Sequence, residues 1–175
     1  FVNHVVVAGF KDMMINNRTV ESINLSDTGI MTHVFPVLED VYSLNNTLTN
    51  LDMSLNEIND DDVMILCKIL QNRCVLENLN LEKNSITDVG AKYLFDILKN
   101  ENSSLKGINL SSNYITFQGA MLLIQAFECN KTLRYINLSH NGLTEKEVIK
   151  LCLKIKDIEP LINRKDLCGK RLYIA

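Results

Sequence analysis

Residues 76–98 read LENLNLEKNSITDVGAKYLFDIL, one complete unit of a pattern that recurs along the chain. The spacing is L-x-x-L-x-L-x-x-N-x-I/L, with related apolar residues accepted at the leucine positions. The pattern starts at Val20, Leu48, Leu76, Leu105 and Leu133. Successive starts are 28, 28, 29 and 28 residues apart. A nearly constant period of this length is the signature of a repeat protein, in which each unit stacks on its neighbours.

The unit at residues 76–98 divides into a strand and a helix. Leu79 and Leu81 alternate with polar residues, as expected of a strand with one buried face. Residues 89–98 then carry apolar side chains at helical spacing, with charged residues on the opposite side. The change of period from two to about 3.6 therefore predicts a strand followed by a helix in each unit.

Each predicted helix is preceded by a residue that can cap it. Thr87, Thr116 and Thr144 occupy the same place in successive units, where a side-chain oxygen can accept hydrogen bonds from the free N–H groups of a helix start. Glu147 follows Thr144 at the T-x-x-E spacing of a capping box. These residues predict where the helices begin.

Stacking such units determines the architecture. Neighbouring strands lie about 4.8 Å apart, whereas packed helices need about 8–10 Å between their axes. The array must therefore curve, with parallel strands on the concave face and helices on the convex face. The predicted fold class is an α/β solenoid of five regular repeats with atypical ends.

The units at residues 76–98 and 105–127 resemble the 28/29-residue repeats of ribonuclease-inhibitor-like leucine-rich-repeat proteins, including the Gly-Ala pair at Gly119-Ala120. Ribonuclease inhibitor, the sensor regions of NOD-like receptors, the Ran GTPase-activating protein and tropomodulin-type actin caps are similar. The resemblance covers residues 20–156 well and the two ends poorly. It implies the horseshoe form of the solenoid.

The resemblance also implies a structural role for the recurring asparagine of each repeat. In the family these side chains bond to backbone groups of neighbouring turns and form a ladder. The ladder positions here are Asn56, Asn84, Asn113 and Asn141. Thr28 replaces asparagine in the first unit, and its hydroxyl offers fewer hydrogen bonds than an amide. We therefore expect that end to be looser or capped differently.

We interpret residues 1–175 as one domain with three parts. Residues 1–19 form an atypical N-terminal repeat or cap, residues 20–156 contain the five repeats, and residues 157–175 form a C-terminal cap. Three consecutive valines favour an edge strand over residues 3–8. The alternative is the helical half of a truncated repeat, with Phe10, Met13 and Met14 facing inward.

The C-terminal cap is predicted from the failure of the repeat pattern. Positions one period after the fifth repeat hold Arg164 and Asp166 instead of leucines. Pro160 is expected to stop the preceding helix, because proline lacks a backbone N–H. Residues 171–174 form a candidate short final strand.

The concave face is predicted to present three columns of side chains. The first column is Ser22, Asn50, Asn78, Gly107 and Tyr135. The central column is Asn24, Asp52, Asn80, Asn109 and Asn137. The third column is Ser26, Ser54, Glu82, Ser111 and Ser139. Beyond it, the rim positions are Asp27, Leu55, Lys83, Ser112 and His140.

This face is polar and nearly uncharged, and Tyr135 is its one aromatic candidate for an interface anchor. His140 adds the most distinctive group of the rim near the C-terminal end. The candidate partner-binding residues are Asn24, Asp52, Asn80, Glu82, Asn109, Tyr135, Asn137 and His140.

Composition excludes several classes of function. A net charge of −3 excludes a strong general affinity for nucleic acid. No apolar run approaches the roughly 20 residues that span a bilayer. The histidines are scattered, and the acidic run at residues 60–62 is explained by a helix N-terminus. We therefore expect no catalytic group, no cofactor and no metal site.

The five cysteines are odd in number and irregular in spacing, which favours free thiols in a reducing compartment. The expected location is the cytoplasm, with the nucleus also compatible. Cys67 and Cys152 share one helical position with Phe95 and Ile124, so we interpret both as packing residues.

These observations predict a non-catalytic module that binds a protein partner through the concave sheet and the C-terminal rim, as a monomer or as part of a larger chain. The resemblance leaves two alternatives. One is a GTPase activator of the Ran type, which works through an asparagine and an arginine near the repeat edge, although Arg134 is the one arginine flanking a predicted strand. The other is an actin- or cytoskeleton-associated capping scaffold.

Overall fold

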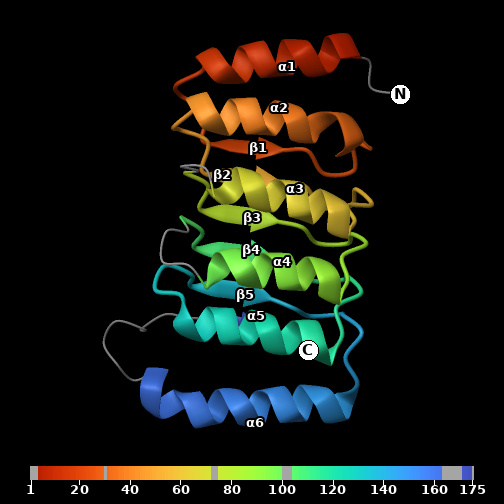
Figure 1. The fold of residues 1–175 in the computed structure, drawn as a ribbon, viewed down its shortest axis with the longest axis vertical. Helices are drawn as coiled ribbons and strands as arrows, with labels where there is room; N and C mark the ends of the chain where they lie inside the picture. The colour runs from red at the N-terminus through yellow and green to blue at the C-terminus, as the bar shows by residue number, and fades with distance from the viewer. Residues whose placement is uncertain (1–3, 30, 72–74, 100–103, 163–170, 175) are drawn as a thin grey trace.

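The computed structural model describes residues 4–29, 31–71, 75–99, 104–162 and 171–174 of the 175-residue chain. Within these residues, six helices and six strands alternate along the chain (Figure 1). The helices are α1 His4–Asn16, α2 Met31–Leu44, α3 Asp60–Gln71, α4 Asp88–Leu98, α5 Phe117–Cys129 and α6 Glu145–Ile162. The strands are β1 Ser22–Asn24, β2 Asn50–Asp52, β3 Asn78–Asn80, β4 Gly107–Asn109, β5 Tyr135–Asn137 and β6 Arg171–Tyr173.

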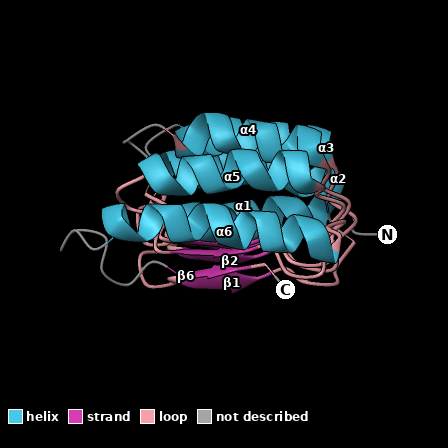
Figure 2. Ribbon diagram, turned by 90° about the horizontal axis from the view of Figure 1, so that it is seen from below, coloured by secondary structure: helices cyan, strands magenta, loops and turns pink. Residues whose placement is uncertain are grey.

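The strands form one parallel sheet in chain order, from β1 to β6. Equivalent positions pair in register, so that Leu79 lies beside Ile108 and Asn80 beside Asn109. All helices lie on one side of this sheet (Figure 2). The two ends of the array bend away from the helix layer at α4 and toward the strands, so the strands line the inner side of the curve. The repeat period therefore produces a leucine-rich-repeat solenoid with strands on the concave face, as predicted.

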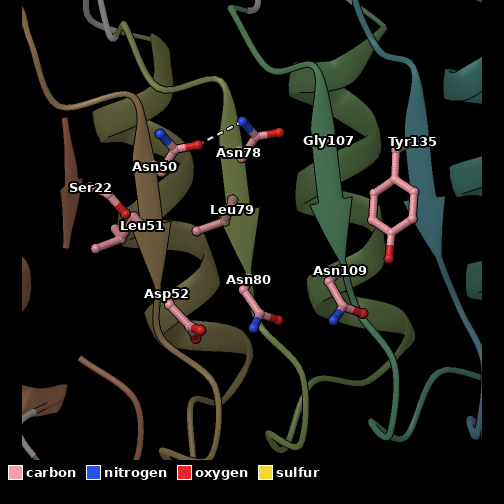
Figure 3. Close-up of a pocket in the computed structure, with 10 residues that line it drawn as sticks. All are labelled: Ser22, Asn50, Leu51, Asp52, Asn78, Leu79, Asn80, Gly107, Asn109 and Tyr135. Atoms are coloured by element: carbon pink, nitrogen blue, oxygen red, sulfur yellow. Dashed lines mark hydrogen bonds between the residues drawn. The ribbon is translucent and has the colours of Figure 1, made fainter. Parts of the chain in front are cut away.

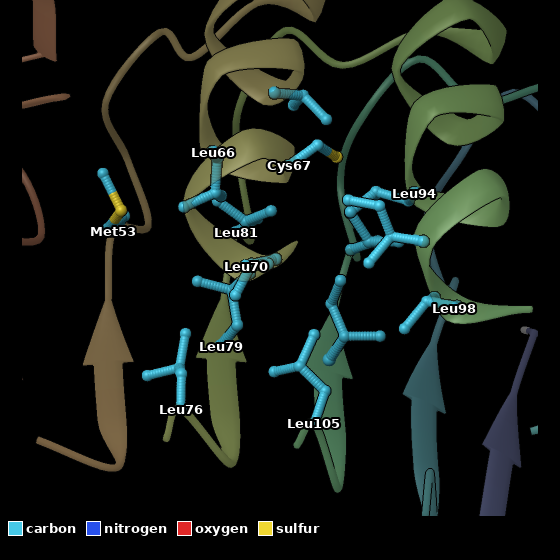
Figure 4. Close-up of a cluster of buried hydrophobic side chains, with 14 of the residues drawn as sticks. Met53, Leu66, Cys67, Leu70, Leu76, Leu79, Leu81, Leu94, Leu98 and Leu105 are labelled. Carbon is cyan, nitrogen blue, oxygen red and sulfur yellow. The ribbon is translucent and has the colours of Figure 1, made fainter. Parts of the chain in front are cut away.

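The core lies between the sheet and the helix layer. Leu76, Leu79 and Leu81 all point into it and are at most 2% exposed (Figure 4). Cys67 packs among these leucines, where burial, aided by the charge of Asp96, raises the pKa of its thiol to about 12. Cys67 is a packing residue, as predicted.

Cys152 differs from Cys67 although both occupy the same position in their repeats. Its side chain is exposed, so the interpretation of Cys152 as a packing residue is wrong. Ile149 and Leu153 on the same helix are also more than half exposed. Helix α6 therefore buries less of its surface than the helices before it, because no further helix lies on its outer side among the described residues.

The recurring asparagines bond to the backbone of the preceding repeat. Asn84 is 6% exposed, and its Nδ2 donates to the carbonyl of Met53 at 3.1 Å and to that of Leu81 at 3.0 Å. Its Oδ1 accepts from the N–H groups of Asn56 and Ile58. The same arrangement recurs at Asn56, Asn113 and Asn141.

Thr28 reproduces only the local part of this ladder. Its hydroxyl donates to the carbonyl of Leu25 at 2.7 Å, within its own turn. The backbone N–H groups of Thr28 and Gly29 are satisfied by Oδ1 of Asn56, from the following repeat. At the ladder position, the first repeat is therefore linked by hydrogen bonds to the following repeat, and among the described residues Thr28 makes no such bond toward α1.

At the N-terminus the strand prediction for residues 3–8 is wrong. The described part of this segment belongs to α1, which packs against α2, and residue 3 lies outside the described residues. Met14 is fully buried and Phe10 partly buried, as in the helical alternative, whereas Met13 is 57% exposed. The local β preference of the valines is outweighed because a helix covers the apolar end of the helix layer.

Two asparagines that follow helices link neighbouring repeats at the other edge of the sheet, where the strands begin. Nδ2 of Asn45 donates to the carbonyls of Met14 and Asn17, at 2.8 and 3.0 Å. Nδ2 of Asn130 donates to the carbonyl of Leu98 at 2.6 Å. Each is at most 3% exposed, so these amides are structural.

At the C-terminus the expectation that Pro160 stops the helix is wrong. Helix α6 continues through Pro160 to Ile162, because proline removes one hydrogen bond without preventing helical dihedral angles. Strand β6, at Arg171–Tyr173, pairs with β5 and forms the predicted final strand. Residues 163–170 of the predicted cap lie outside the described residues.

Candidate protein-binding surface

The sheet register aligns the predicted columns on the helix-free face. In the first column, Asn50 pairs with Asn78 and Gly107 with Tyr135. The alignment follows from the alternation along each strand, because residues between two buried leucines must point to the other face. These columns form the concave face of the solenoid.

The central column holds the turn at the end of each strand. Oδ1 of Asn109 accepts from the backbone N–H of Ser111 at 3.1 Å and from its hydroxyl at 2.8 Å. Equivalent turns are formed by Asn24 on Ser26, Asp52 on Ser54, Asn80 on Glu82, and Asn137 on Ser139. One oxygen of each central residue is therefore engaged in structure, and the rest of the side-chain group faces the concave side.

Asp52 is the one acidic residue of the central column. Its burial alone raises the pKa of the carboxyl group, but hydrogen bonds from the Ser54 backbone, the Ser54 hydroxyl and Asn80 together lower it below its usual range. Asp52 is therefore ionised at neutral pH.

A polar cluster occupies the C-terminal half of the face. Nδ2 of Asn109 donates to Oε2 of Glu82 at 3.1 Å, which links β4 to the turn after β3. Burial raises the pKa of Tyr135, a hydrogen bond with Asn137 opposes this, and the charges of Tyr173 and Glu82 raise it further. Four of the candidate residues, Glu82, Asn109, Tyr135 and Asn137, are therefore electrostatically connected.

The structure adds Tyr173 to this cluster. Strand β6 pairs Tyr173 with Asn137 in the central column. The rings of Tyr135 and Tyr173 lie 5.5 Å apart between centroids, tilted by 59°. Tyr173 is 46% exposed, so the face carries a second aromatic side chain that the repeat pattern did not predict.

Two candidate residues lie apart from this cluster. Asn24 is on β1, about 19 Å from β5 at four strand spacings of about 4.8 Å. His140 is exposed, in the turn beyond β5. Among the described residues, no hydrogen bond or ring contact joins His140 to Tyr135 or Asn137, so His140 stays a separate candidate on the rim.

A hollow of about 220 Å³ lies on the concave face between the first and central columns (Figure 3). Its lining is Ser22, Asn50, Leu51, Asp52, Asn78, Leu79, Asn80, Gly107, Asn109 and Tyr135. Pockets for drug-sized ligands usually measure about 300–1,000 Å³. The hollow is therefore smaller than such pockets.

The rim positions share one backbone conformation. Asp27, Leu55, Lys83, Ser112 and His140 all have φ between 52° and 57°, or 59° at Leu55, in the left-handed region. In each of the first four, the N–H donates to a carbonyl of the next repeat, as from Lys83 to Ser111 at 3.0 Å. The rim is therefore a regular row of left-handed turns.

A second hollow, of about 370 Å³, lies along this rim. Leu55 and Tyr114 line it with 48% and 66% of their surfaces exposed, and Lys83 lies between them in repeat order. Tyr114 is thus an exposed aromatic residue outside the concave columns.

A family model described as Leucine Rich repeat matches residues 44–67, 73–95 and 129–152, and each range contains a strand and the first part of the helix that follows it. This chain is a leucine-rich-repeat protein. Its repeat length and Asn ladder are of the ribonuclease-inhibitor-like subclass.

Curated leucine-rich-repeat relatives align with most of the chain. "NACHT, LRR and PYD domains-containing protein 4E" of Mus musculus is 26% identical over 185 residues, which cover 89% of this chain and 18% of that protein. "Leucine-rich repeat-containing protein AAC1" of Dictyostelium discoideum is 31% identical over 141 residues, which cover 77% of this chain and 17% of that protein. The chain therefore spans less than a fifth of the length of these relatives.

Two solved structures share the fold. The tropomodulin C-terminal domain of Caenorhabditis elegans superposes with a TM-score of 0.64 at 13% identity, covering 92% of this chain and 98% of that one. The structure of leiomodin-1 actin-binding site 2 superposes with a TM-score of 0.61 at 15% identity, covering 92% and 94%. At 13% and 15% sequence identity, these superpositions establish a shared fold.

In the described part of this leucine-rich-repeat protein, no helix is both long and apolar enough to cross a bilayer. Among the same residues, no group of three or more His, Cys, Asp or Glu side chains is arranged to hold a metal ion.

Proposed function

We propose that this domain is a non-catalytic module that binds a protein partner through its concave face, centred on Glu82, Asn109, Tyr135, Asn137 and Tyr173. The observation that carries the proposal is the Tyr135–Tyr173 pair beside the polar cluster, since aromatic residues with hydrogen-bonding tips are the commonest anchors of interfaces. Membership of the leucine-rich-repeat family supports a role in protein interaction.

The asparagines of the central column are already held in place before a partner binds, which favours binding at this surface. Their turn-forming oxygens are already satisfied, which fixes the side chains before binding and reduces the entropy lost on association. Each partner hydrogen bond contributes only about 1 kcal/mol net, so the affinity depends on the tyrosines.

The test is partner capture with substitutions on opposite faces. We expect Asn80→Arg/Asn109→Arg, which adds bulk and charge at the centre of the face, to abolish capture. Tyr135→Ala/Tyr173→Ala is expected to weaken it strongly. Tyr135→Ala/His140→Ala tests the predicted C-terminal rim, and Gln125→Arg on the exposed side of α5 is the matched control.

Capture that survives both concave-face double substitutions would reject the proposal. A partner lost equally with Gln125→Arg would place the interface on the helices instead. Cross-linking of the captured partner to residues of β4 and β5 would support the concave face directly.

The cytoplasm, or alternatively the nucleus, is the proposed location, on the basis of the cysteine content. Among the described residues Cys67, Cys129 and Cys152 are free thiols, which is compatible with a reducing compartment. No cofactor is proposed. Partner capture from fractionated cytosol is the matching experiment.

An actin- or cytoskeleton-associated scaffold is a second candidate. It is favoured by the superposition on the tropomodulin domain and on leiomodin-1 actin-binding site 2 over more than nine-tenths of each of those chains. Co-sedimentation with filamentous actin tests it, and absence from the pellet at micromolar actin would remove it.

The Ran-type GTPase activator is a weaker candidate. In addition to Arg134, the backbone register puts Arg171 beside Tyr135 in the first column, which the sequence pattern did not predict. A GTPase assay that shows no stimulation by the domain would remove this candidate.

A further inference from the structure

Gly107 opens a notch in the middle of the first column. A Cβ atom at this position would lie 2.9 Å from Oδ1 of Asn78 and 3.4 Å from Cδ1 of Tyr135. These two side chains therefore lean over the glycine from β3 and β5 (Figure 3). Leu51 and Leu79 contribute the floor of the hollow through their backbone, because their side chains are buried in the core.

Asn78 directs a hydrogen-bond acceptor into this notch. Its Nδ2 donates to Oδ1 of Asn50 at 2.7 Å, which turns Oδ1 of Asn78 toward Gly107. Asn50 is itself held by the hydroxyl of Thr49, at 2.9 Å from its Nδ2. Among the described residues, no hydrogen bond donated to Oδ1 of Asn78 is found, and this oxygen is available to a donor from a partner.

Tyr135 forms the opposite wall. Its ring lies against the notch, and its hydroxyl extends to the level of Asn109 (Figure 3). The ring face of a tyrosine attracts a cation within about 6 Å of its centroid. The aliphatic stem of a lysine or arginine also packs well against an aromatic ring.

The charges around the hollow are acidic. Asp52 lines it, and Glu82 is linked through Asn109 to its edge. In the columns of β1 to β5, the charged residues are Asp52 and Glu82. The arginine that the register adds to the first column, Arg171 on β6, pairs with Tyr135 and lies two strands away from Gly107. The two carboxylates therefore attract a group of positive charge to the part of the face around β2 to β4.

We propose that the notch over Gly107 receives a basic side chain, lysine or arginine, of the partner protein. The cation lies between Oδ1 of Asn78 and the Tyr135 ring, and the more distant carboxylates of Asp52 and Glu82 attract it through their charge. This inference rests on the protein-binding function proposed above and deepens it, because it names the chemistry that the partner presents.

The test uses two small probes that differ in charge. N-acetyl-arginine methylamide and its neutral isostere N-acetyl-citrulline methylamide are titrated into the ¹⁵N-labelled chain, and the amide signals of Gly107 and the side-chain signals of Asn78 and Asn109 are followed. We expect the arginine probe to shift these signals and to bind about three- to fivefold more tightly than citrulline, as expected of partly exposed ion pairs.

Two variants show where the preference arises. Asp52→Asn/Glu82→Gln retains shape and most hydrogen-bonding capacity, and we expect it to abolish the arginine preference. Asp61→Asn/Glu145→Gln removes the same charge from exposed helix starts and should preserve the preference. Gly107→Ala fills the notch and should weaken both probes. Glu82→Gln alone serves if the double variant does not fold.

Equal binding of the two probes, or an arginine preference that survives Asp52→Asn/Glu82→Gln, would overturn the inference. Partner capture that is lost in Asn80→Arg/Asn109→Arg, combined with no arginine preference, would reject the basic side chain but leave the protein-binding function standing. An arginine preference without any effect of those arginine substitutions on capture would reject the protein-binding function of this face.

Discussion

Asp88 caps the helix of the repeat that follows it. Its carboxylate accepts hydrogen bonds from the backbone N–H of Thr116 at 2.8 Å and from the Thr116 hydroxyl at 2.5 Å, and Thr116 is the N-cap of α5. The N–H of Gly119 also donates to it, at 3.1 Å. Asp60 makes the same three hydrogen bonds with Thr87 and Gly90 one repeat earlier.

Replacing Asp88 should therefore weaken the contact between α4 and α5. We expect Asp88→Ala to lower the free energy of unfolding by about 1–2 kcal/mol, because it removes an acceptor from two N–H groups and a hydroxyl. Urea denaturation measures this. Asp96→Ala is the control, since Asp96 forms a surface ion pair with Lys99 and should cost about 0.5 kcal/mol or less. Equal losses in the two variants would contradict the interpretation.

Gly119 is required by the same contact. A Cβ atom there would collide with Oδ1 of Asp88 and lie 2.9 Å from Cγ2 of Ile115. Glycine to alanine normally stabilises a helix by about 0.5–1 kcal/mol. We expect Gly119→Ala to destabilise this protein instead, by about 1–3 kcal/mol.

A double-mutant cycle isolates the cause of that loss. In the Asp88→Ala background the colliding carboxylate is absent, so the additional cost of Gly119→Ala should fall markedly. Unfolding free energies of the four proteins, measured in urea, give the coupling. Strict additivity of the two substitutions would mean that Gly119 is needed for another reason.

The fifth repeat obtains its cap from its own helix. Phe117 stands at the start of α5 in the place of Asp88, so Thr144 receives no carboxylate from that position. Oε2 of Glu147 instead accepts from the N–H and the hydroxyl of Thr144, at 2.8 and 2.7 Å. Glu147 occupies the position of Gly119, which is possible because no preceding aspartate fills the space.

This capping box should make the stability of α6 depend on pH. Hydrogen bonds from the Thr144 hydroxyl and backbone N–H hold the pKa of Glu147 below its usual range. Because the folded pKa is below the unfolded one, ionised Glu147 stabilises the fold above the usual glutamate pKa of about 4.3, and the contribution is lost as the pH falls through the lowered value.

We therefore expect Glu147→Ala to have a lower melting temperature than the unsubstituted chain at pH 7, and the gap to narrow as the pH falls below the usual glutamate pKa of about 4.3. Melting curves at intervals of half a pH unit measure it. Glu145→Ala, at the exposed first position of α6, is the matched control and should show a gap that changes less. A Glu147→Ala gap that stays constant with pH would show that the ionised carboxylate is not responsible.

The sequence predicted the parts of this fold that repeat at a fixed offset. Leu79 and Ile108 were aligned because they hold the same place in a period of 28 or 29 residues, and the observed register agrees. The contact between Asp88 and Thr116 spans the same offset, but an aspartate at a helix start already has a local explanation as a partner of its own N–H groups. The contact between the two repeats was therefore not predicted, although its residues lie one period apart.

The candidate site was predicted less completely for a related reason. Tyr173 pairs with Asn137, but the chain between them departs from the repeat period, so no offset connected the two tyrosines in advance. The valines of α1 were misread because local β preference gave no account of the apolar end of α2 that a helix must cover.

Leu55 offers a last test, of strain along the rim. Its φ of 59° lies in the left-handed region, which costs a side chain such as leucine about 1–2 kcal/mol, and 48% of its surface is exposed, so little packing offsets this cost. We expect Leu55→Gly to raise the free energy of unfolding by about 0.5–1 kcal/mol, with Leu55→Asn showing a smaller gain. Leu55→Ala removes the side chain but keeps the strain, so it should give no gain. Urea denaturation of the three variants distinguishes the causes, because equal gains for glycine and alanine would attribute the effect to the exposed leucine side chain.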